Sequence, residues 1–277
     1  MRARPDLRAG TRSITSPQNE RVKLIRALEM RKVRRETGLF VAEGTSLLLT
    51  ARAAGWPPKI LVFLAGSRAK QSCAELARWA ESAGAECLEV SAAVLGKLAG
   101  KDNPQSMLGV FEQRWANLPA SKAVGAEELW VALEAPRDPG NLGTILRSIE
   151  AVAASGVVLI GQSCDPYSRE AVRASMGSIF NVPVVGTEAQ AFLAWRAQWR
   201  GEVVGTHLAA GEDFRRVAYQ APVLLLMGSE GPGLSPELAR AASRLVKIPM
   251  AGRLDSLNLA VATALLLYEI RRERLQL

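Results

Sequence analysis

Apolar and polar residues follow one another in blocks that predict two successive α/β units. In the first unit, short apolar runs predict strands at 39–44, 59–66, 86–91 and 106–113. Amphipathic stretches between them predict helices at 45–55 and 72–84. Because strands and helices alternate, we expect a small α/β domain that ends at residue 116.

The second unit begins after residues 117–127, a small and polar stretch typical of a linker. Apolar runs then predict strands at 128–135, 156–161, 183–186, 201–207, 223–226 and 244–250. Helices are predicted from Gly140, over 188–198 and over 256–272. The strands are continuous Val, Ile and Leu runs, which indicates a parallel sheet between two helix layers over 128–277.

Residues 16–38 precede the first unit and predict one capped basic helix. Ser16 is the expected N-cap, Pro17 the first helical residue and Gly38 the stop. Arginines lie opposite an apolar stripe that contains Val22, Ile25 and Leu28.

Charge is concentrated at this end of the chain. The net charge of the whole chain is +8, and residues 1–35 carry eleven Lys or Arg against three acids, so the remainder is neutral. Such a block is the footprint of a phosphate-binding surface. A solvated helix face with a disordered tail is the alternative. The helix residues available for phosphate contact are Arg21, Lys23, Arg31, Lys32, Arg34 and Arg35.

Composition narrows the functional classes. A length of 277 residues suits two domains, and no run of roughly 18 apolar residues predicts a membrane span. The three cysteines form no CxxC pair, which argues against a zinc site and a disulfide framework and suits a reducing cytoplasm. His207 is the only histidine, so we expect no histidine-rich metal site and interpret it as a surface or core residue.

Chemically unusual residues gather in three turns, 136–148, 227–235 and 248–260, each following a predicted strand of the second unit. Parallel sheets bind ligands outside the carboxyl ends of their strands, so we expect these turns to converge on one site. The glycines Gly228, Gly231 and Gly233 allow backbone amides to approach a ligand. A plain connector, or a helix cap at Asp255 and Ser256, explains single turns almost as well.

The first turn combines an amide and a cation at a helix start. If Asn141 caps the helix, Arg147 lies in the second turn and reaches back toward the N-terminus, with Gly143 leaving room. Such a place is suited to anions. The alternative is a surface ion pair of Arg147 with Glu150 or Asp138.

Taken in order, the motifs N-x-G-x-x-x-R (141–147), G-x-E-G-x-G-L-S (228–235) and I-P-M-x-G-x-x-x-S-L-N (248–258) resemble the three signatures of a known family. This family is the SpoU, or TrmH-like, branch of the SPOUT RNA 2′-O-ribose methyltransferases. The stretch REAVRASMGSIFNVPVV is similar to its mid-domain segment. The preceding unit, through LFVAEGTSLL and SMLGVF, resembles the L30e-like RNA-binding domain that many members carry.

The resemblance implies a deep trefoil knot in the second unit, S-adenosylmethionine (AdoMet) as cofactor, and a homodimer formed through the knotted region. Cofactor contacts carry over to Leu226, Gly228, Ile248, Met250 and Leu257. The chain departs from many relatives at Leu259 and Ala260, which follow the third motif.

The resemblance also implies the reaction, methyl transfer to a ribose 2′-hydroxyl. Arg147 is the implied catalytic residue, assisted by Asn141, Glu230, Ser256 and Asn258. A guanidinium stays protonated in proteins, so we expect Arg147 to stabilise the developing alkoxide rather than act as a base. A separate RNA-binding domain favours ribosomal RNA over transfer RNA. A transfer RNA enzyme and a knotted RNA-binding protein without activity are the alternatives.

Overall fold

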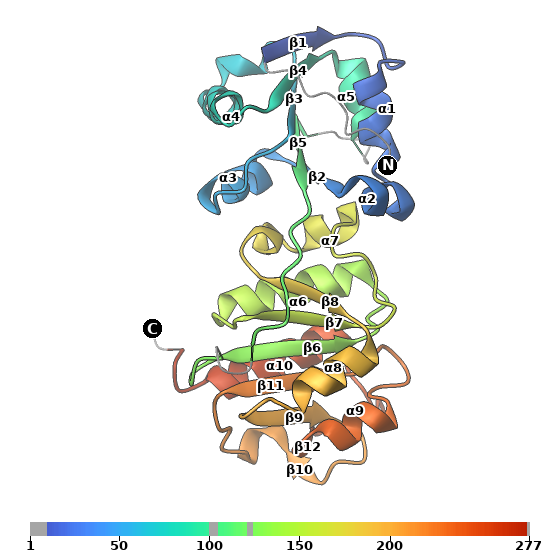
Figure 1. Cartoon of the computed structure of the whole chain (residues 1–277), viewed down its shortest axis with the longest axis vertical. Coiled ribbons are helices and arrows are strands. Elements are labelled where there is room, and N and C mark those ends of the chain that lie inside the picture. Colours follow the sequence, from blue (N-terminus) through green and yellow to red (C-terminus); the bar gives the residue numbers. More distant parts are fainter. Residues whose placement is uncertain (1–9, 100–104, 121–123, 276–277) are drawn as a thin grey trace. The chain divides into compact units, whose positions relative to one another are not determined.

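The computed structural model describes residues 10–99, 105–120 and 124–275, which form two compact units (Figure 1). The first unit comprises Met1–Gln113 together with Tyr167–Phe180, and the second comprises Arg114–Pro166 and Asn181–Leu277. Three cations of the basic block, Arg2, Arg4 and Arg8, lie outside the described residues. Within the described ranges no helix is long and apolar enough to cross a membrane.

The first unit is built on a mixed five-stranded sheet with the strand order β1-β4-β3-β5-β2. Its strands are β1 (Gly10–Ile14), β2 (Leu39–Glu43), β3 (Ile60–Leu64), β4 (Glu86–Val90) and β5 (Met107–Glu112). Strand β5 is antiparallel to β2 and β3, and the other pairs are parallel. The predicted strands are confirmed, whereas β1 was not predicted because its sequence, GTRSI, lacks an apolar run.

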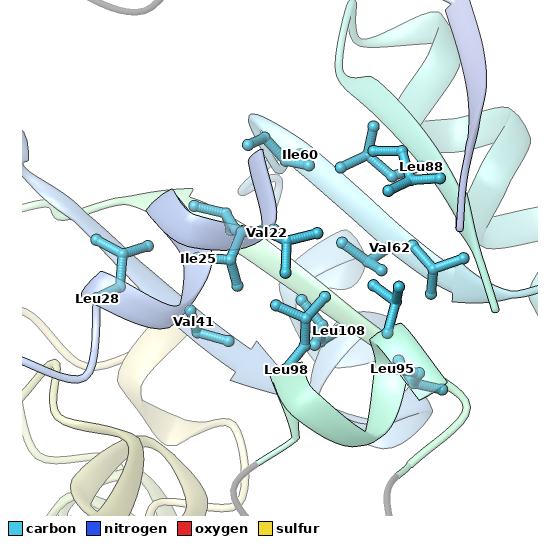
Figure 2. Close-up of a cluster of buried hydrophobic side chains, with 14 of the residues drawn as sticks. Val22, Ile25, Leu28, Val41, Ile60, Val62, Leu88, Leu95, Leu98 and Leu108 are labelled. Carbon is cyan, nitrogen blue, oxygen red and sulfur yellow. The ribbon is translucent and has the colours of Figure 1, made fainter. Parts of the chain in front are cut away.

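Helices of this unit are α1 (Glu20–Ala27), α2 (Arg31–Thr37), α3 (Thr45–Ala53), α4 (Gln71–Ser82), α5 (Ala92–Leu98) and α7 (Arg169–Ala174), with 3-10 turns η1 (Ser67–Ala69) and η2 (Ser178–Phe180). Neither α5 nor α7 was predicted. Figure 2 shows side chains of α1 and α5, among them Val22, Ile25 and Leu98, meeting Val62 and Leu108 of the sheet. These residues form the apolar core on one face of the sheet.

The prediction of one helix over 16–38 is wrong, because the chain breaks it into α1 and α2. Asn19 rather than Ser16 caps α1, with its side chain accepting from the Arg21 N–H. Met30 is extended, with φ −83° and ψ 125°, which interrupts the helical path. Gly38 does end α2, in the left-handed conformation at φ 69°.

An aromatic cluster covers the opposite face of the same sheet. Alternation along a strand points Val41 into the core described above and Phe40 to the other side. There the ring of Phe40 lies 4.8 Å from Tyr167, and Phe111 lies 5.1 Å from Phe180. This packing explains why residues 167–180 group with the first unit. The boundaries predicted from the sequence, with a first domain ending at 116 and a second beginning at 128, assign them to the second.

The second unit contains a seven-stranded sheet with the order β10-β12-β9-β11-β6-β7-β8, and every described pair is parallel, as predicted. Its strands are β6 (Leu129–Glu134), β7 (Gly156–Ile160), β8 (Val184–Thr187), β9 (Glu202–Thr206), β10 (Glu212–Asp213), β11 (Val223–Met227) and β12 (Arg244–Lys247). The helices are α6 (Pro139–Ala151), α8 (Ala189–Arg196), α9 (Pro236–Ala241) and α10 (Leu259–Arg271), with the 3-10 turn η3 (Phe214–Arg216).

Helices cover both faces of this sheet. Trp130 and Ala132 of β6 pack in one core with Phe192 of α8 and Leu238 of α9, which lie in front of the sheet in Figure 1. Helix α10 lies behind the sheet in that view and packs against α6. Leu118, from the described part of the predicted linker, also packs against the core. The linker therefore belongs to the second unit wherever it is described.

Candidate functional site

The three motif turns follow β6, β11 and β12. All strands of the sheet run parallel, so these turns emerge at the same edge. In the sheet, β6 and β11 are neighbours, and β9 alone separates β11 from β12. The sheet thus brings together segments that are more than one hundred residues apart in sequence.

The first turn enters α6 through a cap at Asp138. The Asp138 carboxylate accepts a hydrogen bond from the Asn141 backbone N–H at 2.6 Å, and Pro139 occupies the first helical position. The expectation that Asn141 caps the helix is therefore wrong. Asn141 lies inside the first helical turn of α6, where its side chain is available to bond to other residues.

The second turn folds into a tight hairpin. Ser229 and Gly233 exchange backbone hydrogen bonds of 3.2 and 3.1 Å, and Gly231 and Gly233 have φ values of 95° and 73°. A Cβ on Gly228 would stand 1.9 Å from the carbonyl carbon of Gly233. Only glycine fits at 228, because the returning strand of the hairpin occupies that space.

The third turn ends at Asn258, which caps α10. Its Oδ1 accepts from the backbone N–H groups of Ala260 at 2.9 Å and Val261 at 3.3 Å. The last helix therefore starts at Leu259, three residues later than predicted. Ser256 lies outside this helix, and its hydroxyl donates to the Asp255 carboxylate at 3.1 Å.

A chain of hydrogen bonds joins the three turns. Asn258 Nδ2 donates to Asn141 Oδ1 at 2.9 Å, and Asn141 Nδ2 donates to Glu230 Oε1 at 3.2 Å. Glu230 Oε2 accepts from the backbone N–H of Arg137 at 3.0 Å. Partial burial acts to raise the pKa of Glu230, but the hydrogen bonds from Arg137 and Asn141 lower it below the ordinary carboxyl value. Glu230 is thus held ionised at the centre of the network.

Beside this network lies a cavity of about 350 Å³. Its apolar walls come from Met227, Leu234, Ile248, Met250 and Leu257, and its polar positions include Gly228, Glu230, Ser256 and Asn258. An apolar pocket with a few polar groups and closely approaching backbone is what a nucleoside-sized ligand requires. The residues present therefore fit AdoMet.

Three predicted site residues are not part of this wall. Asn141 is one of them, although it bonds to the wall residues Asn258 and Glu230. Leu226 does not line the cavity, because its side chain is fully buried in the core with Trp130. Arg147 lies on the exposed face of α6, six residues after Asn141, and forms no hydrogen bond or ion pair with any described residue. Neither alternative ion pair of Arg147, with Glu150 or with Asp138, is formed.

The cavity wall also includes residues that the sequence analysis did not assign to the site. These include His207 and Leu208, which follow β9, and Lys247, the last residue of β12. The Nδ1 atom of His207 accepts a hydrogen bond from the Ala209 backbone N–H at 3.1 Å. The signal that could have identified His207 is its position directly after a parallel strand at the ligand-binding edge.

The basic residues predicted to contact phosphates differ in their surroundings. Arg21 Nε lies 2.8 Å from Glu86, whose side chain is completely buried. Arg34 is only 4% exposed and donates to the Leu28 and Glu29 carbonyls at 2.7 and 2.8 Å. These two cations stabilise the fold of α1 and α2.

The other candidate cations, Lys23, Arg31, Lys32 and Arg35, are exposed. Lys23 pairs with Glu20 at 2.9 Å on the surface. Lys32 and Arg35 have no ion pair with a described residue, so their charges face solvent.

Comparison with known proteins identifies relatives over nearly the whole length of the chain. A crystal structure of an AdoMet-bound rRNA methyltransferase from Sinorhizobium meliloti is 44% identical, with a TM-score of 0.87 over 96% of this chain and 99% of that one. The AdoMet complex of the SpoU methyltransferase AviRb from Streptomyces viridochromogenes is 30% identical, with a TM-score of 0.83 over 93% and 98%. A 23S rRNA (guanosine(2553)-2′-O)-methyltransferase of Bacillus subtilis is 28% identical over 94% of this chain and 99% of its own length.

Family descriptions match both units. Residues 19–109 match the MRM3-like substrate binding domain. Residues 128–268 match the SpoU rRNA Methylase family and contain all three motif turns. The structure joins these turns beside one cavity, and the chain belongs to the SpoU rRNA methylase family.

Proposed function

We propose that this protein transfers the methyl group of AdoMet to a ribose 2′-hydroxyl of ribosomal RNA. The observation that carries the proposal is the hydrogen-bond chain through Asn141 that joins two residues of the cavity wall, Asn258 and Glu230. This chain holds the cofactor loops and the start of α6 in one arrangement. Two relatives named for a nucleotide of 23S ribosomal RNA, from Bacillus subtilis and Streptomyces viridochromogenes, align over 94% and 99% of this chain, which favours this substrate class over transfer RNA.

Within this site, Gly228, Ile248, Met250 and Leu257 would hold AdoMet, which supplies an electrophilic sulfonium methyl group. Arg147 would stabilise the alkoxide that develops at the ribose and grip an adjacent phosphate, because its guanidinium keeps its charge. The hydroxyl proton would leave to that phosphate or to water. Asn141 and Glu230 would orient the loops, and Ser256 and Asn258 would contact the substrate.

The test is transfer of labelled methyl from AdoMet to total RNA from a strain lacking the gene, followed by mapping of the modified ribose. Arg147→Ala should abolish transfer while the AdoMet Kd, measured by calorimetry, stays within a few fold. Arg200→Ala is the control, because Arg200 is exposed and precedes β9 at the opposite edge of the sheet. Methyl label in transfer RNA alone would overturn the assignment of ribosomal RNA as substrate. Loss of AdoMet binding in Arg147→Ala would overturn the role assigned to Arg147.

We further propose a homodimer that covers an apolar surface on α10. Val261, Leu265 and Tyr268 are 49%, 40% and 52% exposed and, with Thr144 of α6, line one shallow apolar depression. Association would remove this apolar area from water. Leu265→Glu should convert the dimer to a monomer in sedimentation, whereas Leu49→Glu, at a residue 41% exposed on α3, should not. A wild-type monomer would exclude the assembly.

Binding of RNA by the first unit is the remaining part of the proposal. Arg31, Lys32 and Arg35 are exposed on α2, which suits contact with phosphates. A filter assay with ribosomal RNA should show affinity that falls steeply with salt. Salt-independent binding would argue against this surface.

A further inference from the structure

Besides Arg147, two arginines at the motif turns have no partner within the part of the chain that the structure describes. Arg137, in the first turn, and Arg253, in the third, are exposed, and neither side chain forms a hydrogen bond or ion pair there. Several other arginines of the second unit behave differently, since Arg215, Arg244 and Arg272 each pair with a carboxylate at 2.6 to 2.8 Å.

Both arginines are close to residues of the cavity wall. The backbone N–H of Arg137 bonds to Glu230, which is part of the cavity wall. Arg253 precedes another wall residue, Asp255, by two positions, so their Cα atoms are at most about 7.6 Å apart. The first and third turns thus each place one arginine near the wall of the same cavity.

The carboxylates of these turns do not neutralise them. Asp138 accepts from the Asn141 backbone, Glu230 accepts from Arg137 N–H and Asn141, and Asp255 accepts from Ser256. Each acid is engaged by a neighbouring N–H or O–H group, and none pairs with either guanidinium. Two guanidinium groups that keep their charge and their donors facing solvent are suited to bidentate contact with phosphate.

We infer that Arg137 and Arg253 bind phosphodiester groups of the RNA strand that flank the methylated ribose. The inference rests on the proposed function and adds the residues that position the substrate at the cavity. Contacts to phosphate fix the register of a nucleic acid without reading its sequence. The two arginines therefore act as positioning residues for RNA and not as contacts of the cofactor.

The test measures binding of a fluorescein-labelled single-stranded RNA of mixed sequence over a range of KCl concentrations. Arg137→Ala and Arg253→Ala should each weaken binding about fivefold, and each should reduce the slope of log K against log salt by about 0.7. Arg137→Lys should retain the slope, because the charge remains. The control variant is Arg200→Ala, at the opposite edge of the sheet, which should bind like the wild type.

A second readout separates this inference from the proposed function. The AdoMet Kd of Arg137→Ala and Arg253→Ala should stay unchanged in calorimetry, and KM for ribosomal RNA should rise more than kcat falls. If both variants have the wild-type slope of log K against log salt and still transfer methyl groups, the inference is wrong and the proposed function is unaffected. Reduced slopes in a protein that transfers no methyl group would support phosphate contact by the two arginines and remove the function.

Discussion

Asn258 binds both the helix that it begins and the helix that begins more than one hundred residues earlier. Its Oδ1 caps α10, while its Nδ2 donates to Asn141 Oδ1 at 2.9 Å. One side chain therefore couples a structural cap to a side-chain hydrogen bond between the first and third motifs. These two roles use different atoms and can be separated by substitution.

Asn258→Asp keeps the capping oxygen and removes the amide donor. Asp and Asn cap helices about equally well, so the free energy of unfolding should change by less than about 1 kcal/mol. Asn141 cannot compensate by rotating its amide, because its Nδ2 is needed by Glu230. Methyl transfer should fall about tenfold, the equivalent of roughly 1.4 kcal/mol. Wild-type activity with unchanged stability would show that the bond has no role in the reaction.

Gly228 and Gly252 offer a matched pair for the cofactor loops. A Cβ at Gly228 would meet the Gly233 carbonyl carbon at 1.9 Å, whereas a Cβ at Gly252 would meet nothing within 4 Å. Gly228→Ala should therefore open the hairpin and abolish AdoMet binding in calorimetry, with a lowered Tm. Gly252→Ala should bind AdoMet normally. Equal affinities in the two variants would exclude the hairpin as part of the cofactor site.

The sheet and the site edge were predictable because their signals are local. Continuous apolar runs such as 223–226 predict buried parallel strands, and parallel strands present their following turns at one edge. The ordered motifs then indicated which three turns form the site. The knot that the resemblance implies depends on how loops thread past each other, and periodicity does not encode that path.

Other features depend on partners far away in sequence. The break between α1 and α2 is stabilised by Arg34, whose guanidinium bonds to the carbonyls of Leu28 and Glu29. Nothing in the basic pattern distinguishes this arginine from its exposed neighbour Arg35. Likewise, the packing of Tyr167 against Phe40 joins residues on either side of the linker. Tertiary contacts of this kind override the linear division into domains.

His207 is expected to contribute a hydrogen bond to the cofactor. Because Nδ1 accepts from the Ala209 N–H, the proton of the neutral ring resides on Nε2, which makes that atom a donor. Loss of one such bond corresponds to about 1 kcal/mol. His207→Ala should therefore raise the AdoMet Kd about fivefold in calorimetry, and His207→Asn, which retains an N–H donor, should raise it less. An unchanged Kd for the alanine variant would remove His207 from the binding site.

Arg21 and Arg35 should separate folding from RNA binding, although both belong to the same basic block. The Glu86 carboxylate is fully buried and lies 2.8 Å from Arg21 Nε and 3.2 Å from Arg12 Nη1. Arg21→Ala leaves that carboxylate under-compensated and should cost roughly 3 kcal/mol of unfolding free energy in urea denaturation. Arg35→Ala removes an exposed cation and should change stability by less than about 0.5 kcal/mol while weakening RNA binding at low salt.

The contrast between these two variants is the measurement that decides how the basic block works. If Arg21→Ala unfolds like the wild type but loses RNA affinity, its contact with Glu86 is incidental and the residue faces phosphate. If Arg35→Ala retains full affinity at low salt, the exposed cations of α2 do not contact RNA. Either result would change the residues that are assigned to the RNA-binding surface. The present assignment leaves out Arg21, because its charge is paired with the buried Glu86 carboxylate.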